Sequence, residues 1–223
     1  DVAVLGGIMK ALVLGATGAV GSCIVEELLH DDRYKEVHTF VRRPSSIKHP
    51  KLTEHVVDFE VMYDWAKELT GDVLFSAMGI SKKKAGSKDA QWHVDYDYQY
   101  NVARTAAANG VKTYALVSSV GANPDSSFFY LSMKGFLEEA VKKMEFSNVL
   151  IAQPATLIRP QPRKREAVSY KVLGLLNKVG LAKSQEPIPV EQVAKALVTD
   201  ATKAALSDDK HIEILSNQYM LSF

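Results

Sequence analysis

A stretch near the start of the chain combines an aliphatic run, a glycine-rich turn and an amphipathic segment. Residues 10–14 form an apolar run of the kind found in strands buried on both faces, and residues 22–29 have apolar side chains at helical spacing. Between them stand Gly15, Ala16, Thr17, Gly18, Ala19, Val20 and Gly21. The stretch therefore predicts a strand that turns on glycine into a helix.

This turn predicts an anion site. The first N–H groups of a helix have no partner within it, and the helix dipole attracts negative charge. Glycines allow close approach to the backbone, so the seven turn residues are candidate contacts of a nucleotide pyrophosphate. The spacing is Gly-x-x-Gly-x-x-Gly rather than Gly-x-Gly-x-x-Gly, so the motif alone leaves open a tight turn in another α/β protein.

The remaining apolar runs alternate with helical patterns. Strands are expected at residues 38–41, 56–58, 72–79, 113–119, 148–153 and 211–216, and helices at 63–69, 95–109, 130–141, 168–179 and 190–206, with a loop at 80–89. This alternation predicts an α/β fold: a doubly wound, mostly parallel sheet of Rossmann type, flanked by helices on both faces.

Several candidate ligand contacts stand where the predicted strands end, the edge at which such sheets bind ligands. Arg42 and Arg43 occupy the position that meets the adenosine ribose, and guanidinium groups suit the 2′-phosphate of NADP; two solvated arginines are the alternative. Asp58 is expected beside adenine or as a turn cap. Gly79 ends the fourth strand, where backbone can lie close to a ligand.

Two other patterns are less specific. The run Lys82-Lys-Lys84 is interpreted as a solvated loop, with nucleotide contact as the alternative. The tyrosines at 96, 98 and 100 are expected to point in different directions on a helix, and so not to form a stacking platform.

Tyr130 and Lys134 are the candidate catalytic pair. They stand four residues apart on a predicted helix and so share one face. A tyrosine has a pKa of about 10, and a nearby cation lowers it toward the range useful for proton exchange. A serine at the preceding strand end, Ser119, could hydrogen-bond a substrate carbonyl. An ordinary helical pair is the alternative.

Composition sets limits on partners and class. With 223 residues, 47% hydrophobic, and a net charge of +1, the chain suits one globular domain and gives no footprint for nucleic acid. The single cysteine, Cys23, excludes an internal disulfide, and six histidines without ligand spacing argue against a metal site. No apolar run reaches the roughly 20 residues of a membrane helix. A cytoplasmic location is expected, with Met9 as the natural start; oligomeric state stays open.

The motifs together resemble the atypical branch of the short-chain dehydrogenase/reductase superfamily, and more closely the Tat-interactive-protein-like oxidoreductases. The second resemblance is carried by four segments, which are Lys84-Ala-Gly86, Val94-Asp-Tyr-Asp-Tyr98, Phe129-Tyr-Leu-x-x-Lys-Gly135 and Gln153-Pro-Ala-Thr-Leu157. The resemblance covers nearly the whole chain. It implies one NAD(P)-binding domain over residues 1–223, with a nucleotide-binding core at 9–150 and a substrate-pocket portion at 151–223.

The resemblance also implies roles for individual residues. NADPH would be held by the glycine turn and the arginine pair, with further contacts from Met78, Gly79, Tyr130, Lys134, Leu157 and Arg165. The implied catalytic trio is Ser119, Tyr130 and Lys134. Two departures stand out: Asp95 replaces the asparagine of many relatives, leaving Asn101 further along the helix as packing or backbone support, and Gln153 precedes Pro154 in place of arginine.

Three functions follow as hypotheses. The first is an NADP(H)-dependent oxidoreductase acting on a small carbonyl or alcohol substrate through Tyr130 and Lys134. The second is a regulatory or scaffold protein that senses NADP(H) without turnover. The third is epimerase or dehydratase chemistry on a nucleotide sugar, which usually needs a longer substrate lobe. The substrate itself is not identified by the sequence.

Overall fold

The computed structural model describes residues 8–160 and 185–223. A seven-stranded sheet has the order β3-β2-β1-β4-β5-β6-β9, and all its neighbouring strands are parallel. Its strands are β1 (Met9–Leu14), β2 (Tyr34–Val41), β3 (Leu52–Val56), β4 (Val73–Ser76), β5 (Thr113–Val117), β6 (Asn148–Gln153) and β9 (His211–Ser216). The predicted doubly wound parallel sheet is confirmed.

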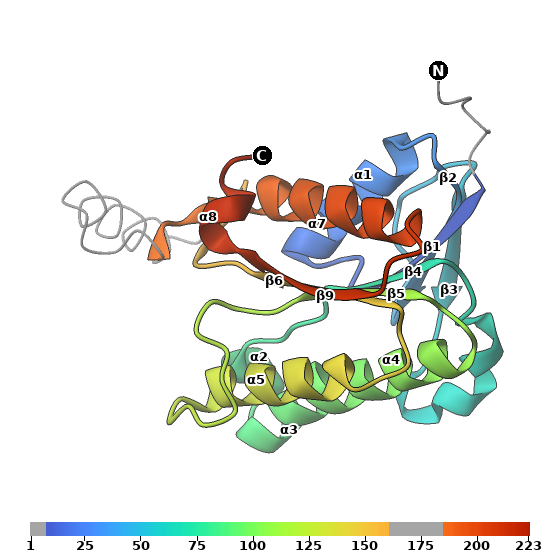
Figure 1. Ribbon diagram of the computed structural model, residues 1–223. Coiled ribbons are helices and arrows are strands. Elements are labelled where there is room, and N and C mark those ends of the chain that lie inside the picture. Colours follow the sequence, from blue (N-terminus) through green and yellow to red (C-terminus); the bar gives the residue numbers. More distant parts are fainter. Residues whose placement is uncertain (1–7, 161–184) are drawn as a thin grey trace.

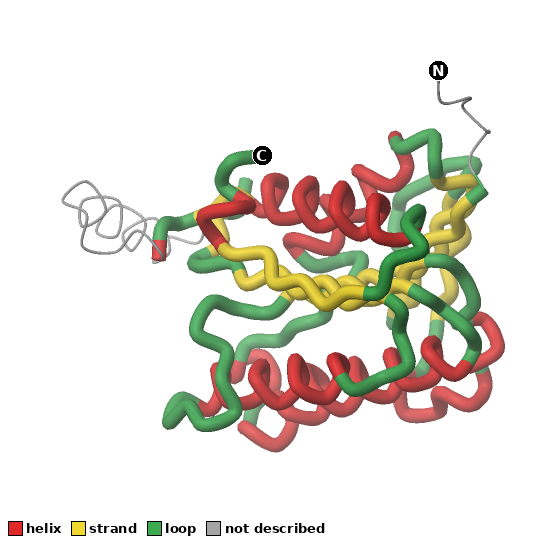
Figure 2. Tube along the Cα trace, viewed as in Figure 1, coloured by secondary structure: helices red, strands yellow, loops and turns green. Residues whose placement is uncertain are grey.

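Helices cover both faces of the sheet (Figures 1 and 2). On one face lie α1 (Ala19–His30) and α7 (Val190–Ala205), and on the other α4 (Gln99–Ala108) and α5 (Phe129–Lys142). Shorter elements are η1 (Phe59–Asp64), η2 (Ala66–Glu68), α2 (Lys82–Ala85), α3 (Lys88–Trp92), the π-helix η3 (His93–Tyr98), β7 (Leu157–Ile158), β8 (Ile188–Pro189) and α8 (Asn217–Met220).

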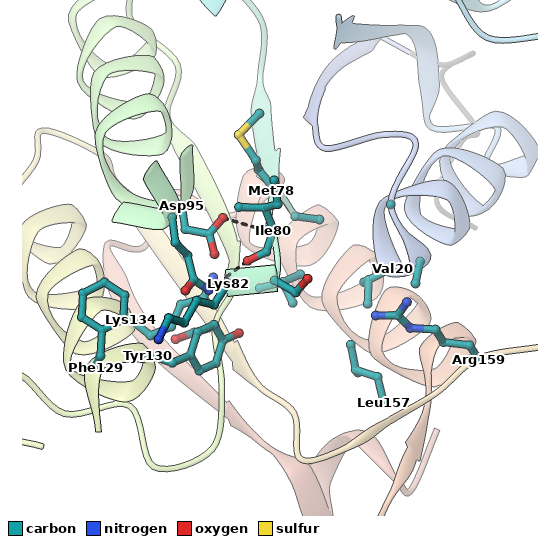
Figure 3. A pocket seen from close by; sticks show the side chains of 18 of the residues that line it. Val20, Met78, Ile80, Lys82, Asp95, Phe129, Tyr130, Lys134, Leu157 and Arg159 are labelled. Carbon is teal, nitrogen blue, oxygen red and sulfur yellow. Dashed lines mark hydrogen bonds between the residues drawn. The ribbon is translucent and has the colours of Figure 1, made fainter. Parts of the chain in front are cut away.

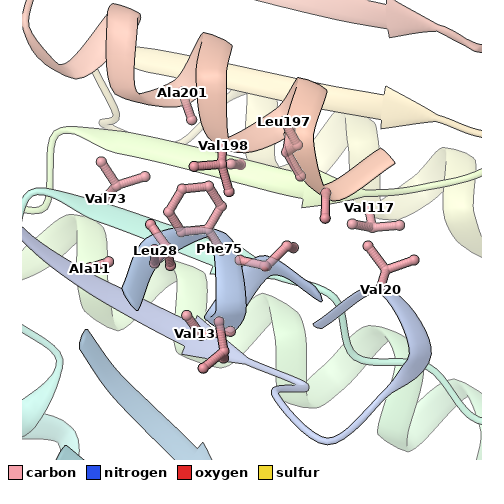
Figure 4. Packing of buried hydrophobic residues seen from close by; sticks show 14 of the residues in the cluster. Ala11, Val13, Val20, Leu28, Val73, Phe75, Val117, Leu197, Val198 and Ala201 are labelled. Atoms are coloured by element: carbon pink, nitrogen blue, oxygen red, sulfur yellow. The ribbon is translucent and has the colours of Figure 1, made fainter. Parts of the chain in front are cut away.

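The core consists of two layers, one on each side of the sheet. In the layer under α1 and α7, Leu28 and Val198 pack against Phe75 of β4 (Figure 4). In the other, Leu137 and Val141 of α5 belong to the cluster that contains the opposite-facing strand residues. Most members of both layers are buried, and such burial contributes about 25 cal/mol per Å² of apolar surface.

The strand order of the sheet determines where a crevice forms. From β1 the chain moves outward to β2 and β3, then returns to β4 on the other side of β1. The connections after β1 and after β4 therefore diverge, which opens a ligand-binding crevice at the carboxyl ends of these two strands.

Two predictions near β3 were wrong. The strand expected at 56–58 lies at Leu52–Val56, where three polar residues stand between Leu52 and Val56 and form a partly exposed edge strand rather than a continuous apolar run. The helix expected at 63–69 is replaced by η1 and η2, because Val61 has non-helical dihedral angles and the Asn109 amide binds the carbonyls of Ala66 and Leu69.

The region between β4 and β5 also differs from expectation. The expected loop at 80–89 contains α2 and the start of α3, each begun by a serine cap, Ser81 and Ser87. The helical path then continues through η3 into α4. The expected helix at 168–179 lies outside the described residues.

Candidate active site

Protein packing alone requires glycine at two positions of the turn after β1. Gly15 has φ +80°, and a Cβ there would lie 2.6 Å from the backbone of Ala77. A Cβ on Gly21 would lie 2.0 Å from the carbonyl oxygen of Gly15. These contacts bring the start of α1 directly over the ends of β1 and β4.

The start of α1 is open to an anion. Gly18 occupies the N-cap position without a side-chain cap, and the first turn carries no acidic residue. Its free N–H groups and the helix dipole favour a bound negative charge. Beside it lies a cavity of about 250 Å³, the turn cavity, lined by Gly15, Ala16, Thr17, Gly18, Phe40, Val41, Arg42, Phe59, Ala77, Met78, Gly79, Ile80, Lys84, Val94 and Tyr98.

The predicted adenosine contacts are only partly together. Arg42 lines the turn cavity and forms no ion pair with any described residue, whereas Arg43 is exposed at the same strand end and does not line this cavity. Asp58 is not among the lining residues either. Its carboxylate accepts the N–H of Glu60 at 2.9 Å and caps η1, which is the alternative of a turn-capping side chain.

A second and larger cavity begins at the same turn (Figure 3). This central cavity has a volume of about 530 Å³. It is lined by Gly18, Ala19, Val20, Ala77, Met78, Gly79, Ile80, Ser81, Lys82, Lys88, Gln91, Asp95, Val117, Ser118, Phe129, Tyr130, Lys134, Leu157 and Arg159. It shares the walls Gly18 and Ala77 to Ile80 with the turn cavity, so the two adjoin.

Tyr130 and Lys134 project together into the central cavity from α5 (Figure 3). Lys134 is 3% exposed, and its Nζ lies 5.7 Å from the centroid of the Tyr130 ring. Tyr130 is 41% exposed, so its phenol is accessible to a ligand. The site thus presents a buried ammonium group and an accessible phenol side by side.

A third cavity continues the row beyond Tyr130. This outer cavity, about 480 Å³, shares the walls Ser118, Tyr130, Leu157 and Arg159 with the central cavity. Its other lining residues are Ser119, Val120, Gly121, Leu131, Pro154, Ala155, Thr156 and Gln185. Tyr130 therefore stands between a cavity that reaches the glycine turn and one that does not.

The two adjacent serines, Ser118 and Ser119, donate their hydroxyl protons to different acceptors. Ser118 donates to the Glu138 carboxylate at 2.5 Å, and the Gln153 amide donates to both oxygens of the same carboxylate at 3.0 Å. Ser119 instead donates to the neighbouring Val120 carbonyl at 3.2 Å, a local bond that is easily exchanged. Ser119 lines only the outer cavity, and its proton is the one available to a ligand there.

Three side chains fix the loop after β4, which separates the turn cavity from the central cavity. Gln91 donates to the Ile80 carbonyl at 2.9 Å, Asp95 accepts the Ile80 N–H at 2.8 Å, and Gln99 donates to the Met78 carbonyl at 3.2 Å. Asp95 is 1% exposed; burial raises the pKa of its carboxyl, and the charge of Lys134 opposes that rise. Asp95 is thus a support for the loop, while Asn101 lines none of the three cavities.

Sequence reasoning missed several lining residues. Lys82 and Lys84 come from the lysine run treated as solvated, and Lys88 and Arg159 were not singled out. The signal for the lysines was present, since Ser81, Ser87 and Gly86 are helix-cap residues that fold this segment over the crevice. Leu157 lines two cavities, whereas Arg165 lies outside the described residues.

The residues present fit a dinucleotide. The row of cavities offers a glycine cradle, free helix N–H groups and an unpaired arginine at one end and a polar, acid/base-equipped wall at the other. No described group of three or more histidine, cysteine or carboxylate side chains could hold a metal ion. None of the helices in the described part of the chain has the length and apolar character to cross a membrane.

Comparisons with known proteins agree with this fit. A protein-family model described as NAD(P)H-binding matches residues 15–204. The protein "FMP52, mitochondrial" of Meyerozyma guilliermondii is 32% identical over 213 residues, which cover 93% of this chain and 92% of that protein. Protein HTATIP2 of Rattus norvegicus is 31% identical over 218 residues, covering 95% and 88%.

A solved structure supports the fold, and names of relatives correct one expectation. "MoeE5 in complex with UDP-glucose and NAD" superposes with a TM-score of 0.68 at 17% identity, covering 96% of this chain and 80% of that chain. Such low identity bears on the fold alone.

The expected cytoplasmic location is contradicted, because four fungal relatives are named mitochondrial proteins. Composition and a lack of apolar runs carry no information about organelle.

Proposed function

Because this chain belongs to the family of NAD(P)H-binding proteins, we propose that it is an NADP(H)-dependent oxidoreductase that interconverts a carbonyl compound and an alcohol. The observation that carries the proposal is the place of Tyr130, which lines both the central and the outer cavity next to the buried Lys134. Tyr130 can thus contact both a ligand that is held at the glycine turn and a second ligand in the outer cavity.

The cofactor contacts follow from the walls of the turn and central cavities. The N–H groups at the start of α1 would hold the pyrophosphate, and Arg42 would hold the 2′-phosphate, with Lys84 as a second cation in the lining of the turn cavity. Met78, Gly79 and Leu157 would line the nicotinamide side. Bound NADPH supplies a hydride, which adds two electrons to the carbonyl carbon.

The protein's own residues supply the proton and orient the substrate. Tyr130 gives the proton from its Oη to the carbonyl oxygen, and Lys134 stabilises the negative charge left on the phenol oxygen. Ser119 donates a hydrogen bond to the substrate oxygen, since the Ser118 proton is held by Glu138. Alcohol oxidation runs the same steps in reverse.

A turnover assay tests this function. Purified protein with NADPH is offered a panel of quinones, aldehydes and ketones, and oxidation is followed by absorbance. Tyr130→Phe is expected to lower the rate by about 10²–10⁴-fold while NADPH still binds, because only the proton donor is removed. Tyr63→Phe, at a tyrosine 80% exposed outside the cavities, is the matched control and should keep its rate.

Other outcomes identify the alternatives. NADPH binding without oxidation across the panel contradicts an oxidoreductase and supports a sensor or scaffold. Conversion of a UDP-sugar in the presence of NAD supports epimerase chemistry.

A second experiment tests cofactor preference. Arg42→Ala should weaken NADPH by about tenfold, or about 1.4 kcal/mol, and leave NADH nearly unchanged, because only NADPH carries the 2′-phosphate. Tighter binding of NADH than of NADPH by the unaltered protein contradicts the NADP(H) assignment. For location, we place the protein in mitochondria on the names of its fungal relatives, and cell fractionation tests this.

A further inference from the structure

We propose that the substrate carries an anionic group, a carboxylate or a phosphate, on an apolar body that also bears the carbonyl, and that Lys82 and Lys88 select this anion. The inference rests on the proposed function and deepens it. It comes from the distribution of charge on the cavity walls.

The walls are strongly basic, although the chain as a whole is balanced. The full sequence has 27 basic and 26 acidic residues. The central cavity is lined by four cations, which are Lys82, Lys88, Lys134 and Arg159, against the single acid Asp95. The described lining of the outer cavity includes Arg159 and no acid. A concave site with one sign of charge concentrates ligands of the opposite sign.

Protein groups do not neutralise this charge. The Asp95 carboxylate is buried, accepts the Ile80 N–H, and acts electrostatically on Lys134. The ion pairs among the described residues include neither Lys82 nor Lys88. Both lysines therefore remain available to an anion in the cavity.

The cations divide between the two sides of the cavity. Arg159 lies on the side of Val20, facing the start of α1, where the cofactor phosphates are proposed to bind (Figure 3). Lys82 lies on the opposite side, with Tyr130 and Lys134 (Figure 3). Lys88 is on that side too, since its Nζ lies 5.3 Å from the ring of Phe129, the residue before Tyr130. The two lysines thus border the place where the carbonyl must meet the phenol.

The remaining walls describe the body of the substrate. Beyond Met78 and Leu157, which would border the nicotinamide, Ile80, Val117 and Phe129 give the central cavity an apolar lining. An aromatic or aliphatic carbonyl compound with one acidic group matches both the apolar surface and the two lysines.

Matched aldehydes test the proposal. The probes are 4-carboxybenzaldehyde, 4-formylphenyl phosphate and the neutral 4-methylbenzaldehyde, which share the aromatic aldehyde. We expect at least one anionic probe to have a kcat/KM well above that of the neutral one, and high salt to remove the difference. The carboxylate and phosphate arms distinguish the two anions. Equal use of neutral and anionic probes overturns the inference.

Substitutions of the two lysines test whether these side chains bind the anion. Lys82→Met and Lys88→Met should each raise KM for the preferred anion by about fivefold, with kcat and the neutral probe unaffected, since each removes one partly solvated charge contact. Lys83→Met is the control, because Lys83 follows Lys82 in α2 and lines none of the three cavities. An equal loss in Lys83→Met, or weaker NADPH binding in place of the KM effect, overturns the assignment of these lysines.

A binding arm is independent of turnover. Calorimetry measures 4-(hydroxymethyl)benzoate and 4-(hydroxymethyl)phenyl phosphate, the alcohol products of the two anionic probes, against the NADP⁺-loaded protein and the Lys88→Met variant. Weaker binding of either alcohol by the variant supports the inference even where no aldehyde is reduced, an outcome that would contradict the proposed function alone. Equal binding by both proteins, or no binding of either alcohol, contradicts the inference.

Discussion

The buried carboxylate of Glu138 shows how one side chain can set the chemistry of another. It is 4% exposed and accepts hydrogen bonds from Ser118 and Gln153, so it fixes the rotamer of a serine that lines two cavities. Glu138→Leu leaves the buried Ser118 hydroxyl and the half-buried Gln153 amide without this acceptor and should cost about 1–3 kcal/mol in the free energy of unfolding, measured in urea. Glu138→Gln retains an acceptor and should cost less. Its exposed neighbour gives the control Glu139→Leu, expected within about 0.5 kcal/mol of the parent.

The ring of His93 should make stability depend on pH. Hydrogen bonds to Asp97 and Glu60 raise the pKa of His93 above its ordinary value of about 6.5. A raised folded-state pKa means that the contribution is complete below that ordinary value and is lost as pH rises through the folded-state value. Urea unfolding of His93→Asn should therefore differ most from the parent at about pH 5.5 and least at about pH 8.5. A difference that grows with pH would contradict this reading.

At the scale of elements, two glycines have different roles. Packing requires Gly21 in the turn after β1, whereas Gly79 in the loop after β4 lines two cavities. A Cβ on Gly21 meets the Gly15 carbonyl, so Gly21→Ala should cost about 1–3 kcal/mol of stability. A Cβ on Gly79 meets nothing within 4 Å, so Gly79→Ala should fold with stability unchanged within about 0.5 kcal/mol. Because Gly79 lines two cavities, that variant should nevertheless weaken NADPH about tenfold in a fluorescence titration. Unchanged affinity would place the cofactor elsewhere.

Long, regular elements were predictable from the sequence, and short ones were not. Strands β6 and β9 have the expected bounds, and α7 ends one residue before its expected end. The apolar run of β6 and the buried face of α7 leave few alternatives, whereas β9 is a largely exposed edge strand marked by its isoleucines and leucine. Strand β3 and helix α2 depend on an edge position and on single caps such as Ser81, which weak local patterns do not specify. Tyr96 and Tyr100 stack at 5.8 Å while Tyr98 contacts Phe59, so the expectation that the three tyrosines diverge held only for Tyr98.

The strand-end residues of the site were predictable from the sequence, but the other side chains that line its cavities were not. Residues at strand ends, such as Arg42 and Gly79, follow from topology, since parallel strands bring their carboxyl ends to one edge. Lys88 begins the capped helix α3 and Arg159 directly follows the short strand β7, and the positions of both elements depend on tertiary packing. Their place in the cavity lining could therefore be identified only in the folded structure.

At the scale of the whole molecule, cofactor binding should stabilise the fold. A ligand that binds only the folded protein adds about 2.7 kcal/mol at a concentration of 100 Kd. For a chain of 223 residues this corresponds to a rise of about 5–11 °C in Tm. Thermal unfolding with and without NADPH measures it, and Arg42→Ala should show a smaller rise at the same NADPH concentration. No shift at saturating NADPH would contradict a cofactor site in the folded state.

Asn217 joins two segments that form the far end of the row of cavities. Its side chain accepts the N–H of Ala155 and donates to the carbonyl of Glu186, and both neighbours adjoin the walls of the outer cavity. The described lining of the turn cavity, by contrast, lies entirely between Gly15 and Tyr98. About 120 residues therefore separate the last wall of this cavity from Asn217, which ties the outer cavity together. A growing chain thus carries the described lining of one end of the row well before it carries the residue that closes the other.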